Sequence, residues 1–136
     1  KVTLLSVEVR QPEELDRAFA AITSQRADGV LILTDPITFR QRGRIIEFAT
    51  RTRLPSMFEV REFVDEGGLI SYGPHRPDLY RRTASYVDRI LKGANPAELP
   101  IEQPTRFELF VNVKAAKALA LAIPRSVLLS ADRVIE

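Results

Sequence analysis

Apolar and polar positions alternate between two periods along the first half of the chain, which predicts strands separated by helices. Positions 2–9 alternate with a period of two and predict a first strand. A helix is expected from Pro12, because proline suits the first helical position. Its predicted buried face consists of Leu15, Ala18, Phe19 and Ile22. Residues 30–33 are continuously apolar, which is typical of a strand covered on both faces.

The same alternation of elements continues to residue 72. The turn Thr34-Asp35-Pro36 precedes a predicted helix. The apolar side of that helix comprises Ile37, Ile45, Ile46, Phe48 and Ala49. A third strand is expected over 54–58 and a fourth over 69–72. Strands that alternate with helices predict an α/β protein with a mostly parallel sheet.

The second half of the chain begins with a long helical pattern over 77–92, which Gly93 ends. Its side chains predicted to face a core are Leu79, Ala84, Val87, Ile90 and Leu91. Three prolines within 94–104 predict an extended crossing segment. Residues 107–113 then alternate as a strand with two different faces. A short helix over 114–121 is expected to end before Pro124, followed by a short turn to the end of the chain.

Length and composition indicate one ordinary globular domain. The chain has 136 residues, of which 45% are hydrophobic and 28% charged, and its formal net charge is +2. This charge is too small to indicate a nucleic-acid partner or an acidic membrane surface. The absence of cysteine excludes disulfides and thiolate metal sites. Because the chain opens inside an expected strand, we expect it to be a piece of a longer protein.

Few residues indicate catalysis. His75 is the single histidine and is predicted to be an exposed loop residue, so no imidazole metal cluster can form. No glycine-rich phosphate-binding motif is present, which argues against a nucleotide site. We therefore expect no catalytic residue, no metal and no cofactor.

The candidate binding residues are Asp35, Glu59, Arg61 and Tyr72, which follow or end predicted strands. Ligand crevices form outside the carboxyl ends of parallel strands. Asp35 could cap the next helix, cap it and also contact a ligand, or act as the phosphoacceptor of a receiver domain. Glu59 and Arg61 lie two positions apart and could pair with each other or hold the charged ends of a zwitterion. Tyr72 could be a packing residue or a ligand platform.

A long ordered stretch resembles one family of proteins. The matching segments are ADGVLILTDP from Ala27, REFV from Arg61, GGLISYGP from Gly67, YVDRILKGANPAELP from Tyr86 and EQPTRFELFVN from Glu102. They resemble the solute-binding proteins of ABC transporters, in the group that includes streptococcal tryptophan-binding lipoproteins.

This resemblance implies a type I periplasmic-binding-protein fold in which ligand is trapped between two lobes. The chain resembles the C-terminal half of such a protein. Residues 1–73 would supply βα units of the second lobe, 74–104 a helix and crossing segment of the other lobe, and 105–136 the return strand and C-terminal helices. The glycines of GGLISYGP would let backbones cross closely at the hinge, with Tyr72 beside the hinge and the cleft.

The function implied is that of an extracytoplasmic solute-binding component of an ABC importer, without enzymatic activity. Its expected partners are a small, amino-acid-like ligand and the membrane permease, and its expected location is periplasmic or otherwise extracytoplasmic, at the membrane through the transporter. The alternative is an effector-sensing domain of a transcription regulator with the same fold. Because half of a two-lobed protein exposes apolar surface, we also expect this chain to form a dimer or higher oligomer.

Overall fold

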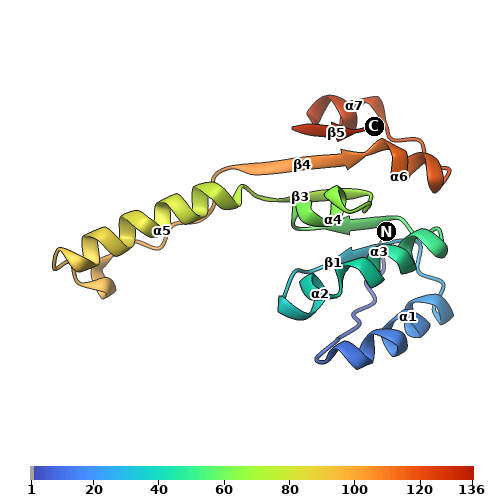
Figure 1. Ribbon diagram of the computed structural model, residues 1–136, viewed down its shortest axis with the longest axis horizontal. Helices are drawn as coiled ribbons and strands as arrows, with labels where there is room; N and C mark the ends of the chain where they lie inside the picture. The colour runs from blue at the N-terminus through green and yellow to red at the C-terminus, as the bar shows by residue number, and fades with distance from the viewer. Residues whose placement is uncertain (1) are drawn as a thin grey trace.

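The computed structural model describes residues 2–136 and contains one five-stranded sheet with the order β1-β2-β3-β4-β5 (Figure 1). Its strands are β1 (Val30–Ile32), β2 (Ser56–Phe58), β3 (Ile70–Pro74), β4 (Phe107–Asn112) and β5 (Arg133–Ile135). β1, β2 and β3 are parallel, β4 is antiparallel to β3, and β5 is parallel to β4. The predicted α/β class with a mostly parallel sheet is therefore confirmed.

Helices connect the strands. They are η1 (Pro12–Glu14), α1 (Leu15–Ser24), α2 (Pro36–Arg40), α3 (Arg42–Arg51), α4 (Arg61–Asp65), α5 (Arg76–Leu91), η2 (Pro96–Glu98), α6 (Val113–Ala118) and α7 (Arg125–Ser130). We call residues 12–74 and 106–136 the body, and residues 75–105 the arm.

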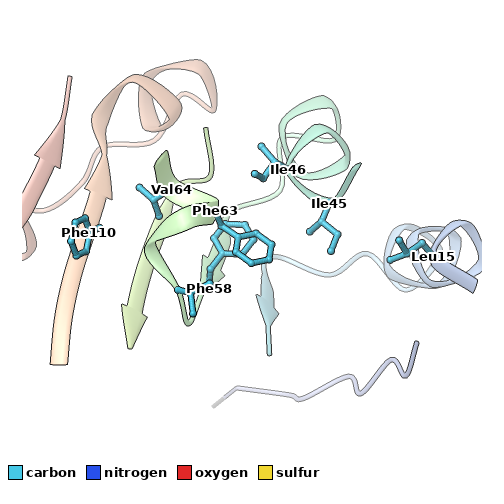
Figure 2. Packing of buried hydrophobic residues seen from close by; sticks show 8 residues of the cluster. Leu15, Ile45, Ile46, Phe58, Phe63, Val64 and Phe110 are labelled. Carbon is cyan, nitrogen blue, oxygen red and sulfur yellow. The ribbon is translucent and has the colours of Figure 1, made fainter. Parts of the chain in front are cut away.

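The core lies on one face of the sheet. Phe58 of β2 and Phe63 of α4 are completely buried and stack with ring centroids 4.4 Å apart (Figure 2). Ile45 of α3 and Leu15 of α1 approach them from the helices that cover this face, and Phe110 contributes from β4. The predicted inward positions of α3 are buried, as are Leu15 and Ala18 of α1, because a helix buries the side of its surface on which apolar residues recur. Phe19 and Ile22, also predicted to be buried, are only partly so.

The opposite face of the sheet is largely open. Leu31 pairs in register with Met57, and alternation along the strands places Tyr72 on this same face. Leu31 is 56% exposed, and Leu33 just beyond β1 is 66% exposed. The prediction that residues 30–33 are covered on both faces is therefore wrong for this chain: Ile32 packs against the core, but the side that carries Leu31 and Leu33 is exposed.

Residues 2–9 do not form the predicted strand. Among residues 2–136, β1 is the edge of the sheet and pairs with β2, and residues 2–9 form no hydrogen-bonded ladder with its free edge. Their alternating pattern persists in an extended segment in which Val9 packs against the core while Val2 and Leu4 are exposed.

Three regions of the chain differ from the sequence prediction. The single helix expected after Pro36 is two helices, because Gln41 leaves helical geometry with φ −96° and ψ 12°. α4 was not predicted, since five residues are too few to display a helical period. The final turn expected after Pro124 instead contains α7 and β5, and β5 forms because β4 offers a free edge for parallel pairing.

α5 projects from the body (Figure 1) and has no buried residue. The prediction that its apolar side faces a core is wrong, since nothing within residues 2–136 packs as a second layer over that side, and Leu91 is 82% exposed. Within the arm, Arg82 Nη2 donates to Thr105 Oγ1 at 2.7 Å and Tyr86 Oη donates to the carbonyl of Pro100 at 2.6 Å. Hydrogen bonds to the segment that returns from the end of α5 to β4, rather than burial, therefore hold this helix in place.

Candidate functional site at the carboxyl edge of the sheet

The three parallel strands end along one edge of the sheet. Thr34 and Asp35 follow β1, Glu59 follows β2, and Pro74 ends β3. The core-facing side of this edge, where the body meets the root of the arm, is hollowed by a cavity of about 470 Å³. Open α/β sheets bind ligands at this edge.

Asp35 is a helix cap. Its Oδ1 accepts hydrogen bonds from the backbone N–H groups of Ile37 at 2.6 Å and Thr38 at 2.8 Å. Thr38 Oγ1 accepts in return from the backbone N–H of Asp35 at 2.9 Å, which completes a capping box. The capping role of Asp35 is confirmed, and Asp35 does not line the hollow.

Glu59 and Arg61 both line the hollow but do not pair with each other. Glu59 Oε2 accepts from the backbone N–H of Thr34 at 2.7 Å, which ties the ends of β1 and β2 together. Arg61 donates from Nε to Asp65 Oδ2 at 3.1 Å. Its guanidinium carbon lies 5.1 Å from the ring centroid of Phe110, a cation–π contact.

Tyr72 lies on the other face of the sheet from the hollow. Its ring stacks on Phe107 with centroids 5.5 Å apart and an interplanar angle of 21°, and the residue is half-exposed. Neighbouring Ser71 and Gly73 line the hollow instead, because successive residues of a strand face opposite sides of the sheet. Of the four predicted binding residues, the structure thus brings only Glu59 and Arg61 to one cavity.

The remaining lining comes from β3, α4, the root of α5, and β4. The hollow is lined by Glu59, Val60, Arg61, Glu62, Ser71, Gly73, Pro74, His75, Arg76, Pro77, Tyr80, Glu108 and Phe110. Sequence reasoning missed Glu62 because α4 was not predicted, and it missed Glu108 because that residue reaches the site through antiparallel pairing with Gly73.

The glycine pattern of GGLISYGP does indicate where backbones meet. A Cβ at Gly73 would overlap the carbonyl oxygen of Glu59, so β3 can pass the end of β2 only with glycine here. A Cβ at Gly68 would lie 2.8 Å from the carbonyl oxygen of Phe63. The expectation of close backbone approach at these glycines is confirmed.

His75 is mostly buried at the start of α5, so the prediction of an exposed loop residue is wrong. Its backbone N–H donates to the carbonyl of Arg106 at 3.0 Å. This bond joins the end of β3 to the start of β4, the two strands that connect the body to the arm. His75 Nδ1 lies 2.9 Å from Asp78 Oδ2, and this contact lowers the pKa of the Asp78 carboxyl. His75 Nε2 lies 3.8 Å from Glu108 Oε1.

Across residues 2–136, no group of three or more acidic, histidine or cysteine side chains is placed to hold a metal ion. No helix in this same range is both long and apolar enough to cross a membrane.

Solved structures similar to this chain are bacterial proteins of more than twice its length. A conserved domain protein from Vibrio cholerae is 25% identical with a TM-score of 0.85, and the match covers 93% of this chain and 42% of that protein. An ABC domain from Streptococcus pneumonia, solved in complex with L-Trp, is 27% identical with a TM-score of 0.85, covering 93% and 43% of the two chains.

A ligand-free, open substrate-binding protein from Clostridium difficile is 19% identical with a TM-score of 0.64, and it shares the fold alone. That match covers 93% of this chain and 42% of that protein. A comparison with curated proteins gave no match. The family described as ABC transporter substrate binding protein matches residues 1–135, and the chain therefore belongs to this family.

Proposed function

We propose that this chain is part of the solute-binding component of an ABC importer, that it performs no chemistry, and that a small ligand binds at the carboxyl edge of its sheet. The observation that carries the proposal is the hollow of about 470 Å³ at this edge, where charged side chains from the body and the arm meet. Small-molecule sites are concave and combine apolar walls with a few polar groups.

The family supports the general role. Substrate-binding proteins of this family are extracytoplasmic, bind small molecules and work with ABC permeases. We propose that this chain delivers its solute to such a permease at the membrane. An amino-acid-like solute would suit Glu59 and Arg61, since one carboxylate and one guanidinium complement a zwitterion.

We also propose that the arm belongs to a different lobe from the body. The arm is connected to the body by β3 and β4, and its helix α5 has no buried residue (Figure 1). The similar solved structures are more than twice as long as this chain, which leaves room for a second lobe around the arm. A ligand in the hollow would then contact both lobes and favour their closure.

The test is a ligand screen by NMR with the ¹⁵N-labelled chain against amino acids, sugars and small organic acids. We expect at least one solute to shift the backbone signals of Glu59 and Arg61. For that solute, Arg61→Gln is expected to weaken binding about tenfold, because a charge-assisted hydrogen bond is lost.

Two variants serve as comparisons. Asp35→Ala removes only the helix cap and should bind the solute as the parent does, at a stability cost of about 0.5–2 kcal/mol. Tyr72→Ala tests whether the open face takes part, and we expect unchanged affinity. If every solute leaves the carboxyl edge unshifted, the proposed function is wrong.

A further inference from the structure

The root of the arm holds the single histidine of the chain between two carboxylates that belong to different elements. His75 Nδ1 lies 2.9 Å from Asp78 Oδ2 on α5, and His75 Nε2 lies 3.8 Å from Glu108 Oε1 on β4. Asp78 belongs to the arm, whereas Glu108 belongs to the sheet of the body. The imidazole ring therefore lies at the junction from which α5 projects (Figure 1).

These two carboxylates are better shielded from solvent than the arginines that accompany them. The side chains of His75, Glu108 and Asp78 are 16%, 18% and 28% exposed. Arg106 lies 3.5 Å from Glu108 and 3.8 Å from Asp78, but its side chain is 57% exposed. Arg81, which pairs with Asp78, is 75% exposed. Because solvent screens exposed charges strongly, the arginines compensate the two carboxylates only in part.

The charged groups on the other side of the hollow add no net charge. Glu59 and Glu62 line the hollow from the body, and the guanidinium groups of Arg61 and Arg76 balance them. Arg76 Nη1 lies 3.4 Å from Glu62 Oε1, which joins the arm to α4 as well. The charges that act most strongly on the imidazole are therefore the two carboxylates beside it.

The contact between His75 and Asp78 depends on a proton. Nδ1 is within hydrogen-bond distance of Asp78 Oδ2 but is not aligned with it, and it has no other hydrogen-bond partner within residues 2–136. A misaligned hydrogen bond weakens steeply, whereas the attraction between opposite charges depends on their separation. A neutral imidazole is thus held weakly here, while an imidazolium is attracted by Asp78 and Glu108 together.

The proton is exchanged in the physiological range. Histidine is the side chain that ordinarily changes its charge between about pH 5 and pH 8. Asp78 is available as an anion throughout this range, because the contact with His75 lowers the pKa of its carboxyl from the usual 3.8. The charge of the ring therefore decides how firmly α5 is held to β4.

We propose that His75 is a pH-dependent latch between the arm and the body, which closes when the protonated imidazole bridges Asp78 and Glu108. Closing the latch restricts the orientation of α5 relative to the sheet. When the ring is neutral, the backbone hydrogen bond from His75 to Arg106 remains, so the arm stays attached but moves more freely. Because the bridge favours the protonated ring, the latch is closed on the acidic side and opens as pH rises.

The latch goes beyond the proposed function and does not depend on a solute. If the arm belongs to a different lobe from the body, the latch lies at the connection between the lobes and makes their relative orientation sensitive to pH. A solute that requires one orientation would then bind with a pH-dependent affinity.

The experiment follows the ring of His75 and the amides of α5 in the same 136-residue chain. The ring gives one set of ¹H–¹³C NMR signals, because the chain has one histidine. Hydrogen exchange of residues 80–84, corrected for the intrinsic exchange rate at each pH, measures protection at the root of α5, and the amides of α3 are the internal reference. From about pH 8 to about pH 5 we expect this relative protection to rise about fivefold, the scale of a partly exposed ion pair, with the same midpoint as the ring signals.

Two variants and one matched control locate the latch. His75→Gln keeps a polar side chain that gains no proton, so its relative protection should stay constant over this range. Glu108→Gln keeps the histidine but removes its partner in the body, and the rise should shrink to about twofold or less. Glu13→Gln makes the same change at an exposed position of η1 and should keep the full rise. Dispersed spectra and unfolding midpoints verify that each variant is folded.

Four results overturn the inference. They are a ring that gains no proton down to pH 5, a ring that titrates while the relative protection of α5 stays constant, a full rise in folded His75→Gln, and a full rise in folded Glu108→Gln. If either variant does not fold, the parent still decides, because the two midpoints must coincide. Since no solute is added, a failed ligand screen leaves the latch standing, and a failed latch leaves the proposed function standing.

Discussion

The body and the arm contain helices with equally clear apolar sides, yet the two regions are held together differently. α3 buries Ile45, Ile46 and two neighbouring residues against the sheet, whereas the longer α5 buries none. The arm relies on polar bonds such as those of Arg82 and Tyr86 to its returning segment. An amphipathic pattern thus predicts a helix reliably, but burial requires a second surface, which only the body provides.

The largest expected effect comes from leucines in the two regions. Leu15 is 2% exposed in the core of the body, while Leu91 at the end of α5 is 82% exposed. Leu15→Ala should lower the free energy of unfolding by about 2–5 kcal/mol, because the transfer energy is lost and a cavity remains. Leu91→Ala should change it by less than about 0.5 kcal/mol. Urea unfolding followed by circular dichroism measures both, and equal losses would contradict the distinction between body and arm.

A second prediction concerns close packing in the body. Gly73→Ala should cost about 1–3 kcal/mol, because the new Cβ overlaps the backbone of Glu59 and forces β2 and β3 apart. Gly43 in α3 has no atom near its own Cβ position. Gly43→Ala is the matched control and should stabilise the chain by about 0.5–1 kcal/mol. Thermal unfolding of both variants decides, and a neutral Gly73→Ala would mean that the backbones of Gly73 and Glu59 are not tightly packed.

The smallest expected effect is a pH dependence at the root of the arm. The close contact of His75 Nδ1 with Asp78 Oδ2 lowers the pKa of the Asp78 carboxyl from its usual 3.8 in the folded chain. The folded state therefore binds fewer protons than the unfolded state, so this contribution is present above 3.8 and is lost as pH falls through the lowered pKa.

Hydrogen exchange of the α5 amides measures that dependence. Between about pH 5 and pH 2, protection of α5 should fall more steeply in the parent than in Asp78→Asn, which has no such proton to gain. The amides of α3, whose burial does not depend on this carboxylate, serve as the internal reference. Identical acid profiles in parent and variant would exclude Asp78 as a support of the arm.

Much of the fold could be predicted from the sequence because it depends on local chemistry. The Asp35 cap requires only a short polar side chain followed at the third position by Thr38, and the structure forms both of its hydrogen bonds. The order of strands and helices follows from runs of period two and period 3.6. The candidate site was less predictable, since Glu59 and Arg61 reach the hollow but Ser71 and Glu62, which also line it, were not predicted as binding residues.

The sequence by itself determined the class of fold, the helix caps and the close backbone approach at Gly73, because each depends on neighbours in the chain or on the absence of a side chain. Tertiary structure alone decided which apolar patterns become core. Residues 2–9 and 30–33 carry strand patterns, yet the first remain unpaired and Leu31 stays exposed, because pairing and covering require partners from elsewhere. The hollow has the same origin, since its walls come from β3, β4, α4 and α5, which meet only in the folded chain.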